Sequence, residues 1–127
     1  MELIAIVTGL AALQVFMFAF QAGGARVKTG VEAPAMTGDI GFERASRVHL
    51  NTVEQLVIFL PGLWMFGYYV NPQYGAGIGL LFIIGRFIYR SAYMGDPKKR
   101  TVGFLTGALS MMILVVGGMI GAGMNLM

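Results

Sequence analysis

The nine lysine and arginine residues of this 127-residue chain fall into two clusters, and long stretches without a basic residue lie around them. The first cluster is Arg26, Lys28, Arg44 and Arg47, and the second is Arg86, Arg90, Lys98, Lys99 and Arg100. A charge in the bilayer core is costly, and cytoplasmic loops of membrane proteins collect Lys and Arg. The pattern therefore predicts several membrane-spanning segments whose connecting loops share one basic side.

Composition supports a membrane protein and argues against other classes. Hydrophobic residues make up 57% of the chain and charged residues only 12%, which is about half the charge of an average soluble domain. A soluble domain of this size cannot bury so much apolar surface, and a disordered chain would not contain it. With no cysteine and one histidine, we expect neither a protein thiolate nor a metal site. The net charge of +3 is too small to indicate a nucleic-acid partner.

Turn and breaker residues divide the chain into four predicted helices at about residues 3–24, 42–70, 75–94 and 101–124. The first has the length of a spanning helix rather than of a cleaved signal. The six glycines of the last helix suit close helix packing in lipid. We predict an all-α fold, an integral membrane four-helix bundle that forms a single domain over residues 1–127. The positive-inside rule places the basic loops in the cytoplasm and both termini on the non-cytoplasmic side of a membrane, expected to be the bacterial inner membrane.

The charged residues of the two middle helices lie too close together in the sequence to remain outside the bilayer. Only 31 residues, 55–85, separate Glu54 from Arg86. A turn takes about seven of them and leaves roughly a dozen for each helix, whereas a crossing needs about 20. Long arginine side chains can extend to the membrane surface, but a glutamate cannot. We therefore predict a polar site inside the bundle that opens toward the cytoplasmic side.

Helical spacing arranges the polar side chains of this region in two facing stripes. One stripe comprises Arg44, Arg47, Asn51 and Glu54; the other comprises Arg86, Tyr89, Arg90 and Tyr93, and Arg100 follows at the start of the last helix. A register-fixing ion pair or interfacial tyrosines would explain single members, but ionisable groups within a membrane usually mark function. Excess guanidinium around one carboxylate fits a small zwitterionic anion. Glutathione is one candidate, and other peptides or amino acids fit equally.

Two segments at these positions resemble signatures of the MAPEG family, the membrane-associated proteins in eicosanoid and glutathione metabolism. They are FERASRVHLNTVEQLVIFLPGLW at residues 42–64 and GRFIYRSAYMGDPKKR at residues 85–100. With the four predicted spans, the resemblance covers nearly the whole chain and is closest to a bacterial-type member like the microsomal glutathione transferases. It implies a homotrimer that holds one glutathione at each interface between adjacent subunits, near the cytoplasmic side.

The resemblance also implies roles for individual residues. Five would hold glutathione: Arg47, Asn51, Glu54, Tyr89 and Tyr93. Arg26 and His49 would reach it from the neighbouring subunit, Arg100 would stabilise the thiolate as the catalytic residue, and Arg44, Arg86 and Arg90 would support the site. The chain departs from the family at Val27, where a second basic residue is common, and at Gln55, where an aromatic residue is common. These departures leave the glutathione residues in place and argue against the leukotriene reaction.

We therefore predict a membrane-bound glutathione transferase, with glutathione peroxidase activity as a further expectation. It would activate the glutathione thiol as a thiolate for attack on a lipophilic electrophile or lipid hydroperoxide that arrives through the membrane lipids. A non-catalytic lipid-binding or scaffold member of the same family is the alternative, although lipid binding alone needs none of the Arg, Asn, Glu and Tyr set. A small transporter or proton relay built on Glu54 is the second alternative, and four spans without a broken helix pair argue against it.

Overall fold

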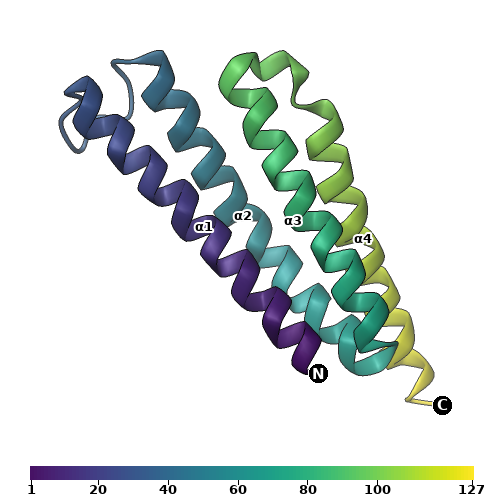
Figure 1. The fold of residues 1–127 in the computed structure, drawn as a ribbon. Helices are drawn as coiled ribbons and strands as arrows, with labels where there is room; N and C mark the ends of the chain where they lie inside the picture. Colours follow the sequence, from purple (N-terminus) through teal and green to yellow (C-terminus); the bar gives the residue numbers. More distant parts are fainter.

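The computed structural model describes all residues, 1–127, and contains four long helices in a bundle (Figure 1). They are α1 (Glu2–Thr29), α2 (Ile40–Tyr69), α3 (Pro72–Gly95) and α4 (Thr101–Met124), with the short 3-10 helix η1 (Pro97–Lys99) before α4. Helices α1 and α4 lie on opposite sides of the α2–α3 pair and each packs against both of them. The prediction of an all-helical fold is confirmed.

Two helix ends differ from the sequence prediction, and local chemistry explains both. Helix α1 continues past residue 24 to Thr29, where Gly30 ends it in the left-handed conformation with φ 74°, which glycine adopts without strain. Helix α3 begins at Pro72 rather than near residue 75. Asn71 caps it, because its side-chain oxygen accepts the Tyr74 N–H at 2.9 Å, and proline at the first helical position needs no N–H partner. The Asn-Pro pair is therefore a helix start as well as a turn.

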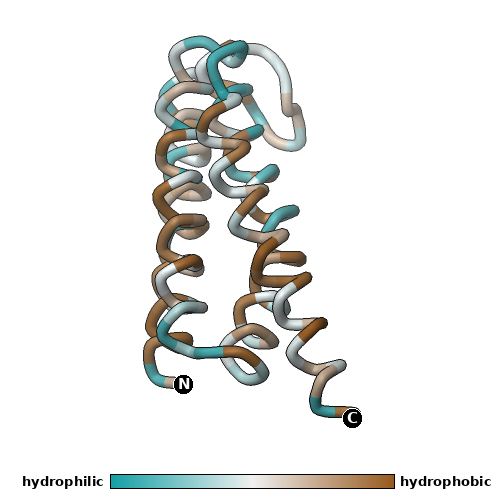
Figure 2. Tube along the Cα trace, turned by 90° about the vertical axis from the view of Figure 1, so that its right-hand side faces the viewer, coloured by the Kyte–Doolittle hydropathy of each residue, from teal (hydrophilic) through white to brown (hydrophobic).

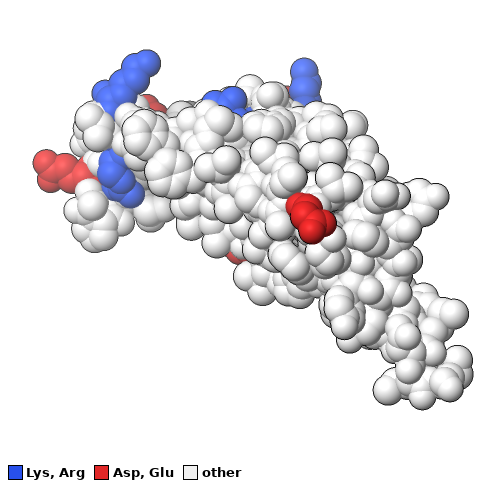
Figure 3. Space-filling model, turned by 60° about the horizontal axis from the view of Figure 1, so that its bottom comes forward, with Lys and Arg blue, Asp and Glu red and all other residues white.

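The bundle has a basic end and an opposite end that carries both chain termini (Figure 1). Hydrophobic residues follow the middle of the helices in Figure 2, and on the face seen in Figure 3 the Lys and Arg side chains lie toward one end. Helices α1, α3 and α4 are each long and apolar enough to cross a membrane. Helix α2 has 30 residues and runs beside them, but it carries four charged residues in its first half. The fold is a membrane bundle in which one helix, α2, carries charged residues in its first half.

The apolar core occupies the half of the bundle nearer the termini. Its centre is a stacked pair, Phe59 of α2 and Phe82 of α3, with ring centroids 4.0 Å apart. A second small cluster, Phe18, Val48 and Tyr89, lies toward the basic end. Helix α4 packs closely on α3, because a Cβ placed on Gly103 would overlap the backbone of Tyr89. The close glycine packing expected for the last helix is therefore present, and it fixes the position of the polar part of α3.

Candidate functional site

Arg47 and Glu54 form an ion pair on the outer face of α2. Their side chains are 3.6 Å apart and 52% and 61% exposed, so the prediction that they lie inside the bundle is wrong for this pair. The reason is that α2 turns a different stripe inward, and Val48, Thr52 and Phe59 are fully buried. A residue one or two positions away from such a stripe lies outside the contact between helices. In a single chain, this ion pair therefore lies at the surface of the bundle.

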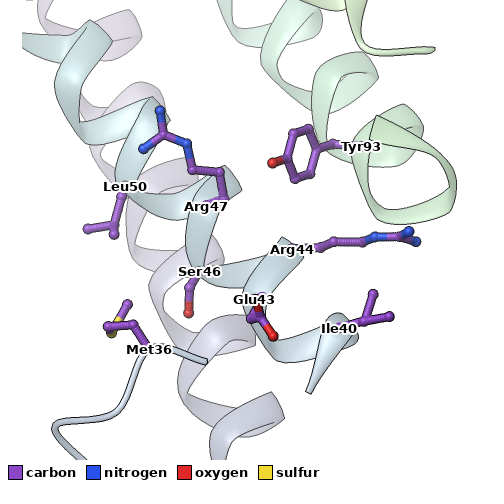
Figure 4. Close-up of a pocket in the computed structure, with 8 residues that line it drawn as sticks. All are labelled: Met36, Ile40, Glu43, Arg44, Ser46, Arg47, Leu50 and Tyr93. Atoms are coloured by element: carbon purple, nitrogen blue, oxygen red, sulfur yellow. The ribbon is translucent and has the colours of Figure 1, made fainter. Parts of the chain in front are cut away.

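Arg47 also lines a hollow of about 560 Å³ at the basic end, between α2, the loop before it and α3 (Figure 4). The lining residues are Met36, Ile40, Glu43, Arg44, Ser46, Arg47, Leu50 and Tyr93. Tyr93 extends from α3 toward Arg47 (Figure 4). The hollow thus offers the Arg47 guanidinium, one carboxylate and one phenol. Its volume lies within the range of about 300–1,000 Å³ that is usual for small-molecule sites.

Arg86 is fully buried and does not line this hollow. Its guanidinium donates hydrogen bonds to Asn51, Thr52 and Gln55 of α2. It also lies over the Tyr89 ring, 4.0 Å from the centroid, a cation–π contact. Tyr89 stacks in turn on Tyr93 with centroids 5.5 Å apart. The structure therefore brings together Asn51, Arg86 and the two tyrosines, and connects them to the hollow through Tyr93.

Two of the expected supporting arginines bind elsewhere in the fold. Arg90 donates from Nε to the side-chain oxygen of Gln21 on α1 at 2.7 Å. It connects α1 to α3 and does not join the stripe on α2. Arg44 donates to the carbonyl oxygens of Met94 and Gly95 at 3.0 and 3.1 Å, where the last carbonyls of α3 lack helical partners. Arg44 is thus both a lining residue of the hollow and a cap on α3.

Arg26 holds the loop that connects α1 to α2. It donates to the carbonyl oxygen of Ala35 at 2.8 Å, and its guanidinium lies over the Phe42 ring, 4.5 Å from the centroid. A longer contact, 3.4 Å, joins it to the sulfur of Met36, which lines the hollow. Within one chain, Arg26 therefore shapes the hollow through its loop and does not line it. His49 is half-buried and makes no side-chain hydrogen bond.

Arg100 lies at the start of α4, away from the hollow that Arg47 and Tyr93 line. Its Nη1 donates to the carbonyl oxygen of Pro97 at 2.7 Å, which steadies the η1 turn. It lines a separate hollow of about 530 Å³ with Lys98, Thr101 and Phe104. A single chain therefore does not place Arg100 and Arg47 around one common cavity.

The neutral polar residues of the helices are functional candidates that the sequence analysis missed. Thr52 and Gln55 bind the buried guanidinium, and Gln21 binds Arg90. Gln14 of α1 donates to the carbonyl oxygen of Ile83 at 2.9 Å, and its own oxygen is buried without a partner. Helical spacing could have indicated them, since Thr52 and Gln55 are three residues apart and share one helix face with Phe59. No group of three or more His, Asp or Glu side chains is arranged to hold a metal ion.

The fold and the site define a class: a small integral membrane helix bundle with a guanidinium-rich polar site at its basic end. Residues 4–120 match the MAPEG family, so the chain belongs to the MAPEG family. It is 46% identical over 116 residues to the uncharacterised protein sll1147 of Synechocystis sp., covering 91% of this chain and 85% of that protein. It is 42% identical over 120 residues to human microsomal glutathione S-transferase 2, covering 94% of this chain and 80% of the human protein. A probable microsomal glutathione S-transferase of Dictyostelium discoideum is 29% identical over 113 residues, covering 85% of this chain and 76% of that protein.

Proposed function

We propose that this protein is a membrane-bound glutathione transferase that also reduces lipid hydroperoxides. The observation that carries the proposal is the hollow lined by Arg44, Arg47 and Tyr93 at the basic end of a membrane bundle, with Tyr93 extending toward Arg47 (Figure 4). Guanidinium forks bind carboxylates in a bidentate manner, and glutathione has two carboxylates. Glu54 beside Arg47 supplies an acceptor for the ammonium group of the same ligand. The names of the microsomal relatives support the same substrate.

The exposed Arg47–Glu54 pair supports assembly into an oligomer. Glu54 lies near the middle of α2 on a face where its neighbours Val57 and Ile58 are exposed and apolar. A charged group that faces lipid at that depth is costly, and a second copy of the chain would cover it. We take the number of copies, three, from the family resemblance. In such a homotrimer Arg26 and His49 of one subunit serve the glutathione of the next.

We place the basic end in the cytoplasm and both termini outside it, by the positive-inside rule, and we assign the protein to the bacterial inner membrane. Glutathione would then enter the site from the cytoplasm. The lipophilic substrate would enter from the lipid. An apolar groove of about 470 Å³ on the outer face of α1, lined by Phe16, Phe20 and Val27 among others, is suited to it.

The chemistry requires a glutathione thiolate. A free thiol has a pKa near 8.5, so only a few per cent ionises at pH 7. In the assembled site the Arg100 guanidinium would stabilise the thiolate, as cations do for reactive cysteines. The thiolate sulfur attacks the electrophile and forms a carbon–sulfur bond while the leaving group departs with its electron pair. With a hydroperoxide, two glutathione molecules give the disulfide, one alcohol and one water. Because the protein has no cysteine, the reacting sulfur is that of glutathione.

Rapid mixing of the detergent-purified protein with glutathione, followed by thiolate ultraviolet absorbance, tests this proposal. We expect a saturable thiolate signal that Arg100→Ala weakens and Glu54→Gln removes. The first variant loses the cation beside the sulfur, and the second loses the carboxylate that binds the ligand. Absence of any signal from folded wild-type protein would refute the transferase proposal. A lipid-binding or scaffold role would then remain, with the α1 groove as its site.

A further inference from the structure

The guanidinium of Arg86 is buried and has no carboxylate partner. Its side chain is 0% exposed, and the two ion pairs of the chain, Met1–Glu2 and Arg47–Glu54, do not include it. Four hydrogen bonds to neutral oxygens hold it. They run from Nε and Nη2 to Thr52 Oγ1 at 3.2 and 2.8 Å, from Nη1 to Gln55 Oε1 at 3.0 Å, and from Nη2 to Asn51 Oδ1 at 2.8 Å.

These hydrogen bonds fix the orientation of two of the acceptors. A guanidinium has only donors, so the atom of the Asn51 amide that faces Arg86 must be its oxygen. The Asn51 nitrogen then lies on the other branch of the planar amide, away from Arg86. It makes no hydrogen bond to any group of the protein, and Asn51 is only half-buried. The Thr52 hydroxyl is fully used, because it also donates to the carbonyl oxygen of Val48 at 2.7 Å.

Asn51 lies one helical turn from Arg47, on the side of α2 that borders the exposed ion pair. A free asparagine could present either its oxygen or its nitrogen to a ligand. With its oxygen held by Arg86, Asn51 can present only N–H donors. The outward NH2 group of Asn51 can thus donate a hydrogen bond to a carbonyl or carboxylate oxygen, but it cannot accept one from an ammonium group. Gln55 supports this arrangement because its side-chain oxygen accepts a hydrogen bond from Arg86 Nη1. Gln55, which departs from the family pattern, therefore has a defined contact.

We propose that Arg86 is a positioning residue that fixes Asn51 as an obligate hydrogen-bond donor to a carboxylate or carbonyl oxygen of glutathione. This inference rests on the proposed function, since it concerns the ligand of the same site. Arg86 does not touch the ligand. It acts through the Asn51 amide, while Thr52 and Gln55 keep the guanidinium in place.

The test compares two isosteric substitutions that each give Arg86 a carboxylate, Asn51→Asp and Gln55→Glu. Both introduce one negative charge that contacts the same guanidinium, so Gln55→Glu controls for the added charge. Only Asn51→Asp also removes the outward N–H donor. We expect both variants to unfold in detergent at temperatures equal to or above that of wild type, because a buried cation gains an opposite charge. Glutathione affinity, measured by equilibrium binding, should fall at least about tenfold further in Asn51→Asp than in Gln55→Glu.

Equal affinities in the two variants would overturn the inference, because the outward donor would then have no effect on the ligand. If Asn51→Asp does not yield folded protein, Asn51→Ala and Gln55→Ala form a second pair. Each removes one acceptor from Arg86, and only the first removes the donor, so the same difference in affinity is expected. Wild-type protein that is folded but binds no glutathione would instead refute the proposed function, and the inference with it.

Discussion

Arg47 and Glu54 are seven residues apart, two turns of α2, and their ion pair lies on the outer face of the bundle at 3.6 Å. An ion pair exposed to water contributes at most about 1 kcal/mol to stability, and charges that face lipid are costly. Its position on a membrane helix therefore calls for an explanation other than stabilisation of the single chain. A ligand that needs both charges, covered by a neighbouring subunit, provides one.

The exchange of these two charges separates ligand binding from stability. We expect the double variant Arg47→Glu, Glu54→Arg to keep the ion pair and to unfold within a few degrees of wild type, since the same two charges remain paired on the same face of α2. Glutathione binding should fall at least about tenfold, because the ligand carboxylate and ammonium would meet like charges. The measurement is equilibrium binding beside thermal unfolding in detergent. Unchanged glutathione binding would show that the pair does not contact the ligand.

Arg100 provides a test that separates catalysis from lipid binding. We expect Arg100→Ala to reduce turnover of a lipophilic electrophile at least about tenfold through loss of thiolate stabilisation. Binding of the same lipophile should not change, because the α1 groove contains no part of Arg100. Lys99→Ala, a neighbouring exposed cation, is the matched control and should leave both quantities near wild type. Equal turnover in Arg100→Ala and Lys99→Ala would show that Arg100 is not the catalytic residue.

Much of the fold could be predicted from the sequence because charge distribution and helix breakers both act locally. The basic clusters marked the two loops at one end, and the glycines of α4 indicated close helix packing, which the structure places against α3. The position of Arg47 and Glu54 could not be predicted in the same way. Periodicity shows which residues share a face of α2, but not which face packs inward when the inward face is itself polar. Thr52 and Gln55 make it polar, and the reason appears only when Arg86 lies against them.

The candidate site shows the same division between local and long-range information. Spacing correctly paired Tyr89 with Tyr93 on one face of α3, where the two rings stack. It also placed Arg90 on that stripe, whereas the structure binds it to Gln21 on α1. That contact joins residues 69 positions apart in the sequence, so local residue spacing cannot predict it.

Arg26 is expected to control the order of the loop between α1 and α2. In Arg26→Ala the carbonyl oxygens of Val31 and Ala35 lose their donor, so we expect faster amide hydrogen exchange across residues 31–36, where a carbonyl contact no longer holds the segment. Arg26→Lys should not restore the slow exchange, because an ammonium lacks the planar fork and stacks poorly on Phe42. Lys28→Ala, which removes an exposed cation two residues away, is the control. Exchange that is equal in Arg26→Ala and Lys28→Ala would show that Arg26 does not hold the loop.

The contact between α3 and α4 depends on the absence of a side chain at Gly103. A Cβ at this position would overlap the backbone of Tyr89 and lie 2.8 Å from the carbonyl oxygen of Gly85. Backbone atoms cannot move aside as a flexible side chain can, so Gly103→Ala must separate the two helices. We expect a loss of about 1–3 kcal/mol in the free energy of unfolding in detergent. Because Tyr89 supports the Arg86 guanidinium, glutathione binding should weaken as well.

Gly23→Ala is the matched control for that substitution, since both glycines lie within helices and a Cβ at Gly23 has nothing within 4 Å. Alanine is the better helix former by about 0.5–1 kcal/mol, so we expect Gly23→Ala to leave the free energy of unfolding unchanged or raise it slightly. A lower free energy of unfolding in Gly103→Ala, beside an unchanged or higher one in Gly23→Ala, separates the cost of close packing from the effect of helix propensity. A Gly103→Ala variant as stable as Gly23→Ala would mean that α3 and α4 can move apart freely. The close approach would then not be what positions Tyr89 and, through it, the buried arginine.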